Sequence, residues 1–341
     1  MSMISTATAV IERLPVPDTI IRLGISHLVG RTHRGRPANG EVDDETFSAA
    51  MRSFPIAANT EEANAQHYEL PPDFFGLILG PHRKYSSGFF MRDGESLAEA
   101  ETNALGLTCS HADLRDGQAI LELGCGWGSL SLWMAAGYPA ARITAVSNSH
   151  AQRQFIQQTA RDRGLSNLTV ITADMNEFTT PERFDRIVSV EMFEHMANWE
   201  PLLARARQWA YPDGRLFLHV FSHTGAPYRF DAADADDWIA RYFFTGGIMP
   251  SHGLVRRFPH LFNVEKEWRW DGRHYQRTAE AWLANFDARS GEIDAILREV
   301  HGADAALWRR RWRLFFLSVS GLFGHDGGGA WGVSHYRLTP V

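Results

Sequence analysis

The segment Leu121–Gly128, with the sequence LELGCGWG, constrains the fold of this chain more than any other stretch. It follows a short apolar run, Ala119–Leu123, and precedes an apolar segment, Ser129–Ala136, that is predicted to be helical. Glycines after a buried strand let the backbone turn sharply, and the N-terminus of the following helix carries a partial positive charge. A strand, a glycine loop and a helix in this order predict the ligand-binding loop of an open α/β sheet.

Further apolar runs alternate with helical segments along the chain. Strands are predicted at Arg142–Val146, Leu168–Ala173, Phe184–Val190 and Leu216–Phe221, and helices at Leu97–Ala112, 149–163 and 199–210. This alternation is typical of a parallel sheet with helices on both faces. Residues 330–338 alternate like a strand that returns to the sheet edge, and residues 1–60 are predicted to be mostly helical, with a break at 35–45. Residues 61–82 are predicted as a further helical lead-in, with Pro71 and Pro72 opening a helix.

Composition excludes several classes of function. The 341 residues are 44% hydrophobic and carry a formal net charge of −6, which gives no support for nucleic-acid binding. The two cysteines, Cys109 and Cys125, lie far from metal-ligand spacing, and no apolar run is long enough for a membrane span. We therefore expect a cytoplasmic protein without a signal peptide or a stable membrane insertion. The basic run Trp308–Arg313 (WRRRWR) is predicted to form an amphipathic helix with a solvated arginine face.

The glycine loop itself suggests its ligand. Its third glycine is spaced differently from that of the dinucleotide fingerprint, and a loop without a pyrophosphate to cradle suits the amino-acid end of S-adenosylmethionine. Residues 146–152 follow the second strand and are placed to reach a ribose. After the third strand, Asp174 is placed to accept a hydrogen bond from an adenine amino group, with Met175 packed on the ring. For Asn148 and Ser149, simple capping of the next helix is an equally good interpretation.

Six segments carry a resemblance to a known family: Tyr85-Ser86 in RKYSSGFF, LELGCGWGSLSL, AVSNSHAQ, SVEMFEHM, DDWIARYFFTGGIMPS and the terminal AWGVSHY. Over residues 66–341 the chain resembles the cyclopropane-fatty-acid synthase superfamily of S-adenosylmethionine-dependent methyltransferases. Within it, the motifs match best the coclaurine N-methyltransferase-like branch. The resemblance implies a class I, Rossmann-like α/β fold with a seven-stranded, mostly parallel sheet and an antiparallel last strand. An N-terminal helical extension and a helical lid insertion would complete it.

We expect four regions: an N-terminal helical extension (1–82), a cofactor-binding core (83–224), an aromatic-rich lid (225–310) and a C-terminal helix and strand (311–341). The implied cofactor is S-adenosyl-L-methionine, released as S-adenosyl-L-homocysteine. The residues assigned to it, partly from the loop and partly from the resemblance, are Tyr85, Ser86, Gly124, Gly126, Ser147, Asn148, Gln152, Asp174 and Met175.

An acidic segment follows the fourth predicted strand. Glu191, Glu194 and His195 would share one face if the segment turns helically. A carboxylate pair attracts an ammonium and accepts its proton, and a histidine is suited to relay it. From the residues alone, helix N-terminal charges and a core histidine are an equally good interpretation. The resemblance implies that these residues position and deprotonate an amine. It also implies that the position of Glu191 is typically glycine in the lipid-cyclopropanating branch.

Aromatic residues are predicted to form the acceptor pocket, because aromatic faces attract cations. The set is Tyr85, Phe193, Trp238, Tyr242, Phe243 and Trp331, of which Tyr85 and Trp331 rest on the resemblance. For Trp238, Tyr242 and Phe243 singly, packing of the lid onto the sheet is the more common role. His219 and His223 lie on one face of a strand, but no third metal ligand can be located, so no metal is expected.

These features predict a methyltransferase that acts on the nitrogen of a small-molecule amine, aromatic or heterocyclic like an alkaloid. The alternatives are cyclopropanation or methylation of an acyl chain of a phospholipid, and O-, S- or C-methylation of a small molecule. A non-catalytic cofactor-binding protein is a third class, which the intact acidic segment disfavours. The resemblance also raises a homodimer, which no sequence feature establishes.

Overall fold

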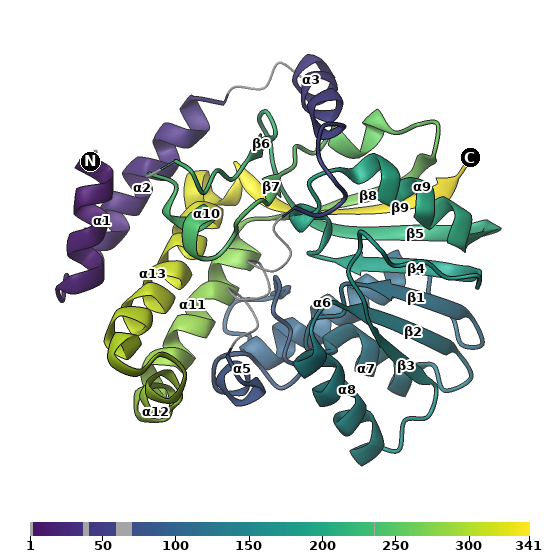
Figure 1. The fold of residues 1–341 in the computed structure, drawn as a ribbon, viewed down its shortest axis with the longest axis horizontal. Helices are drawn as coiled ribbons and strands as arrows, with labels where there is room; N and C mark the ends of the chain where they lie inside the picture. The colour runs from purple at the N-terminus through teal and green to yellow at the C-terminus, as the bar shows by residue number, and fades with distance from the viewer. Residues whose placement is uncertain (1–2, 37–40, 59–69, 235) are drawn as a thin grey trace.

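A single mixed sheet organises the computed structural model, which describes residues 3–36, 41–58, 70–234 and 236–341. Its strand order is β3-β2-β1-β4-β5-β9-β8 (Figure 1). The strands are β1 (Ala119–Leu123), β2 (Arg142–Ser147), β3 (Leu168–Thr172), β4 (Phe184–Val190), β5 (Ala210–His223), β8 (Phe262–Asp271) and β9 (Trp331–Pro340). Strands β1 to β5 pair in parallel, whereas β9 runs antiparallel to both β5 and β8. The predicted seven-stranded, class I Rossmann-like fold is confirmed.

Helices cover both faces of this sheet, because alternate residues of its strands point to opposite sides. On one face, Ile120 of β1, Val188 of β4 and Phe217 of β5 pack against α6 (Leu97–His111) and α7 (Ser129–Gly137). Helix α8 (His150–Asp162) covers β2 and β3. On the opposite face, Leu121 and Ile187 pack against α9 (Trp199–Trp209). The central strands β1 and β4 are therefore mostly buried, and their limits match those predicted from the sequence, whereas β5 extends beyond the predicted Leu216–Phe221 at both ends.

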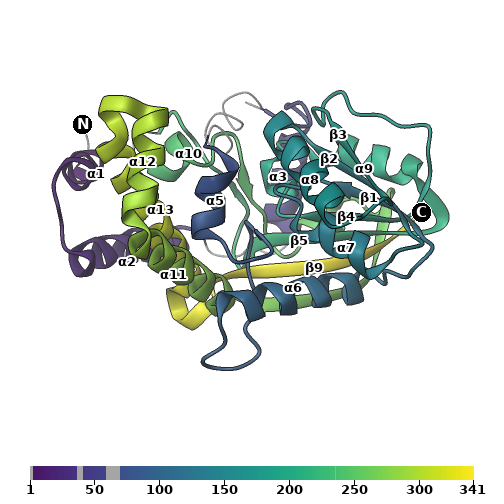
Figure 2. The ribbon, with the colours of Figure 1, turned by 90° about the horizontal axis from the view of Figure 1, so that it is seen from below.

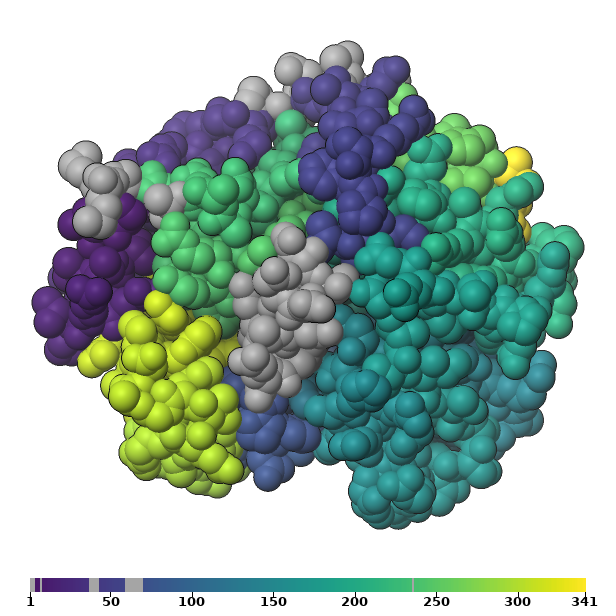
Figure 3. Space-filling model, viewed as in Figure 1, coloured from purple at the N-terminus to yellow at the C-terminus, as the bar shows by residue number. Residues whose placement is uncertain are grey.

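The remaining helices form a lobe beside the sheet (Figure 2). They are α1 (Met3–Arg13), α2 (Asp18–Arg34), α10 (Trp238–Tyr242), α11 (Arg273–Ala288), α12 (Ser290–His301) and α13 (Ala305–Gly324). Helix α2 buries Ile21, Ile25 and Val29 against this lobe. Figure 3 shows the purple N-terminal segment lying against the green and yellow lid and C-terminal segments. The N-terminal extension is thus packed onto the lid.

Two further helices lie near the junction between lobe and sheet: α3 (Glu41–Met51) and α5 (Pro72–Ile78), which begins at the predicted proline. The predicted break at 35–45 and lead-in at 61–82 fall partly on residues 37–40 and 59–69, outside the described residues. No helix of the described ranges has the length and apolar character needed to cross a membrane.

The predicted lid, residues 225–310, contains a strand that sequence analysis did not predict. Strand β8 forms the edge of the core sheet, and a two-stranded sheet of β6 (Tyr228–Arg229) and β7 (Ile248–Met249) lies in the same region. The sequence of β8, FNVEKEWRWD, is charged and mostly exposed, as edge strands often are, so it lacks a clear apolar alternation. Helix α13 also crosses the predicted boundary at residue 310.

The basic run Trp308–Arg313 lies in α13, as predicted, but its arginines are not simply solvated. Arg311 pairs with Glu12 of α1, with 2.9 Å between nitrogen and oxygen, and Arg313 pairs with Asp18 of α2 and Asp287 of α11. Trp312 is fully buried on the other side of the helix. The run therefore fastens the N-terminal helices to the lid.

Candidate active site

A cavity opens at the carboxyl ends of β1, β2 and β4, where open α/β sheets bind ligands. It encloses about 1260 Å³, its mouth included. Every residue that the sequence assigned to the cofactor lines it: Tyr85, Ser86, Gly124, Gly126, Ser147, Asn148, Gln152, Asp174 and Met175. Segments far apart in the chain therefore meet in one cavity, and their contact with a cofactor remains a prediction.

The glycine loop has a backbone that requires glycine. Gly124 has a φ of +78°, and a Cβ atom there would lie 2.5 Å from Cγ of Met192. Gly128 caps α7 in a left-handed conformation, with a φ of +81°. The backbone N–H groups of Gly124 and Cys125 both donate to the carbonyl of Val146, which ties the loop to β2. The loop is thus held close to the cavity with no side chain in the way.

Some polar groups in this cavity have atoms without a hydrogen-bond partner among the described residues. Ser147 donates its hydroxyl to Oε1 of Gln152 at 2.6 Å, whereas Nε2 of Gln152 and Oγ of Ser129 are buried without a partner among the described residues. Ser149 caps α8, as one interpretation of the sequence held, while Asn148 lines the cavity. Unsatisfied buried donors are costly unless a ligand completes them, so the donor set fits the amino-acid and ribose ends of S-adenosylmethionine.

Three charged residues of the cavity wall were missed from the sequence, namely Arg83, Lys84 and Glu122. Burial raises the pKa of Glu122 to about 7, partly offset by a hydrogen bond from Ser131. Burial likewise lowers the pKa of Lys84 to about 8, against the attraction of Glu191 and Glu101. Glu122 lies inside the glycine motif itself. Lys84 is one of only two lysines in an arginine-rich sequence. This rarity could have drawn attention to it, because lysine, unlike arginine, can lose its charge when buried.

Glu191 directly follows strand β4 and faces the cavity, with three hydrogen-bonding groups around its carboxylate. The backbone N–H of Ser87 and Nε2 of His219 lie 3.0 and 3.1 Å from Oε1, and the Tyr275 hydroxyl lies 2.6 Å from Oε2. Its side chain is 8% exposed. Burial raises the pKa of Glu191, although Lys84, Tyr275 and Ser87 lower it. Neither His219 nor Tyr275 was predicted as a site residue, because only the fold brings β5 and α11 to β4.

The backbone at Glu191 is left-handed, with a φ of +48°. Such a conformation costs a non-glycine residue of the order of 1 kcal/mol or more. Glycine, which the resemblance implies for the lipid-cyclopropanating branch, would adopt this conformation without strain. A glutamate that tolerates this conformation is consistent with a functional role for its carboxylate.

Glu194 and His195 belong to a short 3₁₀ turn, Phe193–His195, so the turn begins only after Glu191. His195 lines the cavity, and its ring centroid lies 4.4 Å from that of Phe244. Glu194 is fully buried behind the wall, where Oε1 accepts the backbone N–H of Phe221 at 2.6 Å and Oε2 has no partner among the described residues. Burial, together with the charge of Glu191, raises the pKa of Glu194 well above its usual range.

The residues predicted for the acceptor pocket are scattered. Tyr85 lines the cavity, whereas the described wall does not include Phe193, Trp238, Tyr242, Phe243 or Trp331. Phe193 packs edge-on against Trp199, Phe243 stacks on Phe315, and Trp331 stacks on His223. The indole of Trp238 donates to Glu12, and Arg311 lies over the ring of Tyr242.

These contacts match the packing interpretation of the lid aromatics. Among the described lid residues, Thr245 reaches the cavity wall, and sequence analysis did not single it out. His219 and His223 bond different partners, and the described residues contain no group of three or more side chains suited to hold a metal.

Comparisons with known proteins agree with this geometry. Residues 57–323 match the family model described as mycolic acid cyclopropane synthetase. The (S)-coclaurine N-methyltransferase of Thalictrum flavum subsp. glaucum is 38% identical over 84% of this chain and 81% of its own length. A crystal structure of coclaurine N-methyltransferase bound to N-methylheliamine and SAH superposes with a TM-score of 0.95 and 33% identity, covering 99% of this chain and 100% of that one.

The cyclopropane synthase MmaA2 from Mycobacterium tuberculosis superposes with a TM-score of 0.70 and 26% identity, over 83% of this chain and 99% of that one. The fold, the glycine loop and the cavity agree with these matches. The chain therefore belongs to the mycolic acid cyclopropane synthetase family and is an S-adenosyl-L-methionine-dependent methyltransferase.

Proposed function

We propose that this enzyme transfers a methyl group to the nitrogen of a small-molecule amine. The observation that carries the proposal is the buried carboxylate of Glu191 at the cavity wall, with its raised pKa and its hydrogen bonds to Ser87, His219 and Tyr275. The names of several relatives support it: the coclaurine and pavine N-methyltransferases of Thalictrum flavum subsp. glaucum are 38% and 31% identical to this chain.

An amine acceptor needs a base. Most aliphatic amines are protonated at neutral pH, and an ammonium has no lone pair with which to attack. A buried carboxylate attracts the cation and, because burial raises its pKa, holds the proton it receives more firmly than an exposed glutamate would. Glu191 would accept this proton on a carboxylate oxygen. Glu194 would hold the turn beside Glu191 in place through the hydrogen bond that it accepts from the Phe221 backbone, and His195, on the cavity wall, would orient the acceptor.

The cofactor site would be built from the glycine loop and the polar residues around it. When bound, S-adenosyl-L-methionine supplies an electrophilic methyl group on a positively charged sulfur. Gly124 and Gly126 would leave room for its amino-acid end, Gln152 would offer its unpaired amide, and Asp174 would accept from the adenine. Placing the nucleophile in line with the methyl would supply much of the rate.

Lipid modification is the main alternative, because cyclopropane synthases belong to the same family. The resemblance implies a glycine at the position of Glu191 in that branch, and a bound bicarbonate as base. In this chain a carboxylate is already present there, with its own hydrogen-bond donors. We therefore favour the amine.

The proposal is tested by incubating purified protein with methyl-labelled cofactor and panels of acceptors. One panel contains primary, secondary and tertiary amines with aromatic or heterocyclic rings, and the others contain phenols, thiols and vesicles of unsaturated phospholipid. We expect labelled product from amines, with little from the other panels. Transfer to phenols, thiols or lipid with none to any amine would overturn the amine assignment while leaving the enzyme class intact.

A further inference from the structure

Three imidazoles, hydrogen-bonded in series, connect Glu191 to the end of helix α6. Nε2 of His219 lies 3.1 Å from Oε1 of Glu191, and Nδ1 of His219 lies 2.8 Å from Nε2 of His335. Nδ1 of His335 lies 2.8 Å from Nδ1 of His111. His219 and His335 are register partners on β5 and β9, and His111 ends α6. Neither His335 nor His111 has a place in the proposed chemistry.

Each imidazole in this chain is neutral at pH 7. Burial lowers the pKa of His219 and of His335 well below the usual histidine range, and it lowers the pKa of His111 to about 4. The charge of Lys84 acts in the same direction on both buried rings, as Arg337 does on His111. A neutral imidazole has one N–H donor and one acceptor nitrogen. Three neutral rings in a row can therefore bond in only one of two directions.

The carboxylate at the end of the chain selects the direction. An ionised carboxylate accepts hydrogen bonds and cannot donate them, so His219 must present its hydrogen on Nε2. Its Nδ1 is then an acceptor and takes a hydrogen from Nε2 of His335. Nδ1 of His335 in turn accepts the hydrogen on Nδ1 of His111. In this arrangement every N–H points toward Glu191.

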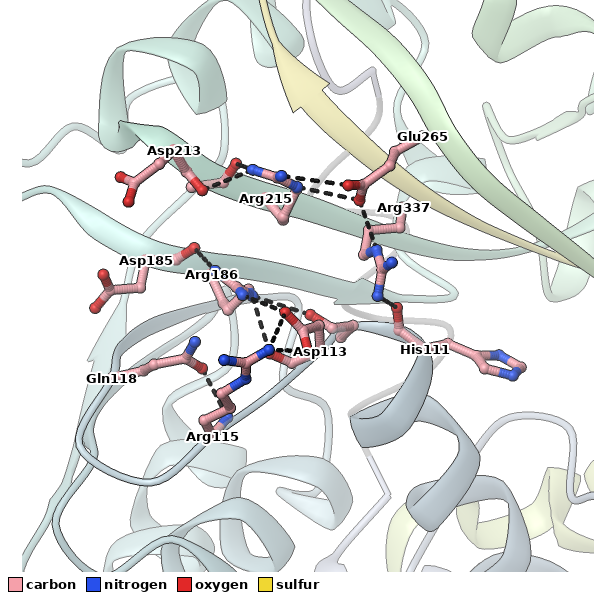
Figure 4. A network of polar contacts seen from close by, with 12 residues as sticks. His111, Asp113, Arg115, Gln118, Asp185, Arg186, Asp213, Arg215, Glu265 and Arg337 are labelled. Atoms are coloured by element: carbon pink, nitrogen blue, oxygen red, sulfur yellow. Dashed lines mark hydrogen bonds and ion pairs between the residues drawn. The ribbon is translucent and has the colours of Figure 1, made fainter.

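The surroundings hold the rings in place. His219 and His335 are fully buried, and the Trp270 ring packs against both, with centroids 5.3 and 4.3 Å away. The His111 ring stacks on Trp268 at 3.9 Å with an interplanar angle of 4°. Arg337 bonds the His111 carbonyl, and Figure 4 shows the His111 imidazole pointing away from the ion pairs around Asp113. The imidazole of His111 therefore bonds His335 of β9 and takes no part in those ion pairs.

We propose that His335 and His111 are positioning residues, which fix His219 in the tautomer with its hydrogen on Nε2 and thereby keep Glu191 ionised and oriented as the base. If the donor from His335 is lost, His219 can carry its hydrogen on Nδ1 instead. A lone pair would then face the carboxylate of Glu191, which would be stable only when protonated. The other groups facing Glu191, namely Lys84, Tyr275 and Glu194, are unchanged by that loss.

The test compares His335→Phe with His335→Gln. Phenylalanine keeps a planar ring but has no donor, whereas the glutamine amide reaches the position of Nε2 and can still donate to His219. The tautomer is read by nitrogen NMR of the cofactor-free protein labelled with ¹⁵N-histidine. We expect the Nε2–H form of His219 in wild type and His335→Gln, and its loss in His335→Phe. An unchanged His219 signal in His335→Phe would overturn the proposal.

The second readout is the pH profile of kcat/KM for an amine, which rests on the proposed function. We expect the acid limb of His335→Phe to move upward by about one pH unit, so that the rate on that limb falls about tenfold, with rescue in His335→Gln. His252→Phe is the matched control, because His252 bonds Ser222 and Ser334 on the same two strands and bonds none of the three imidazoles. The control should leave the limb in place, and an equal shift in it would count against the proposal.

The two readouts distinguish a failure of the tautomer proposal from a failure of the proposed function. A wild type that methylates no amine removes the proposed function, while the NMR comparison still decides the tautomer. If His335→Phe does not fold, His111→Phe and His111→Asn replace the pair, because His111 is only partly buried and asparagine retains a donor near the position of Nδ1. Loss of the ordered tautomers in His111→Phe but not His111→Asn is expected. The same signals in both variants would overturn the role of His111.

Discussion

At the scale of single residues, Glu191 concentrates the features expected of a functional side chain. It adopts a backbone conformation that favours glycine, its carboxylate is buried, and three hydrogen-bonding groups from separate parts of the chain converge on it. The motif together with the family resemblance singled out this residue in the sequence, whereas the motif alone left a structural role equally possible. Its partners His219 and Tyr275 lie 28 and 84 positions away, and no local pattern indicates such contacts.

Glu191→Gln should remove the base while keeping the shape of the side chain. We expect kcat/KM for an amine to fall by about 10²- to 10⁴-fold, the usual contribution of a positioned base. Cofactor affinity, measured by calorimetry on the same preparation, should change little. Glu182→Gln, at an exposed glutamate, is the control. Near-normal turnover in Glu191→Gln would move the base elsewhere.

The pH profile should report the buried carboxylate directly. Because burial raises the pKa of Glu191, the base is lost at a higher pH than an exposed glutamate would be. We expect kcat/KM for an amine to decline with falling pH along a limb centred above 4.5. In Glu191→Gln the residual activity should lack this limb. A wild-type rate that stays flat below pH 5 would contradict the assignment.

At the scale of elements, the buried strands were predictable and the edge was not. Strands β1 and β4 begin and end at the predicted residues, because both faces of each are covered and their residues are mostly buried. Strand β8 contains the charged residues Glu265, Lys266, Glu267 and Arg269, which interrupt any apolar alternation. Its pairing with β9 depends on the tertiary fold. The residues that the motifs assigned to the cofactor meet in one cavity, whereas the placement of the lid aromatics depended on packing.

The contact between α2 and α13 depends on a small residue. A Cβ atom at Gly321 would lie 2.4 Å from Cγ2 of Ile25, so the helices approach closely there. Gly321→Val should separate them and lower the free energy of unfolding by about 1 to 3 kcal/mol. Gly106→Ala, in the open middle of α6, should instead raise it by about 0.5 to 1 kcal/mol. Chemical denaturation of both variants decides this, and equal stability would mean that α2 can shift at no cost.

At the scale of the whole molecule, buried carboxylates make stability depend on pH. The folded pKa of Glu122 is about 7 against an ordinary value of 4.5, so its contribution is fully present below pH 4.5 and is lost as pH rises through 7. This shift corresponds to roughly 3 kcal/mol above pH 7. The buried histidines act in the opposite direction, because their depressed pKa values destabilise the fold as pH falls. A variant must therefore be compared with wild type at each pH.

Glu122→Gln should remove the contribution of this one group. We expect the variant and wild type to have similar free energies of unfolding at pH 4.5. The variant should become more stable by up to roughly 3 kcal/mol at pH 8. Denaturation of the cofactor-free proteins across this range measures the difference, with Glu182→Gln as an exposed control. A constant difference at all pH values would show that Glu122 does not titrate in this range.

The central proposal for the whole molecule is that the methyl group goes to a nitrogen beside Glu191. The most direct measurement uses cofactor labelled with ¹³C in the methyl group and an aromatic acceptor that carries both an amine and a phenol. The chemical shift of the labelled carbon in the product identifies the atom that received it. We predict an N-methyl product from wild type and its near absence from Glu191→Gln. An O-methyl product from wild type would contradict the claim.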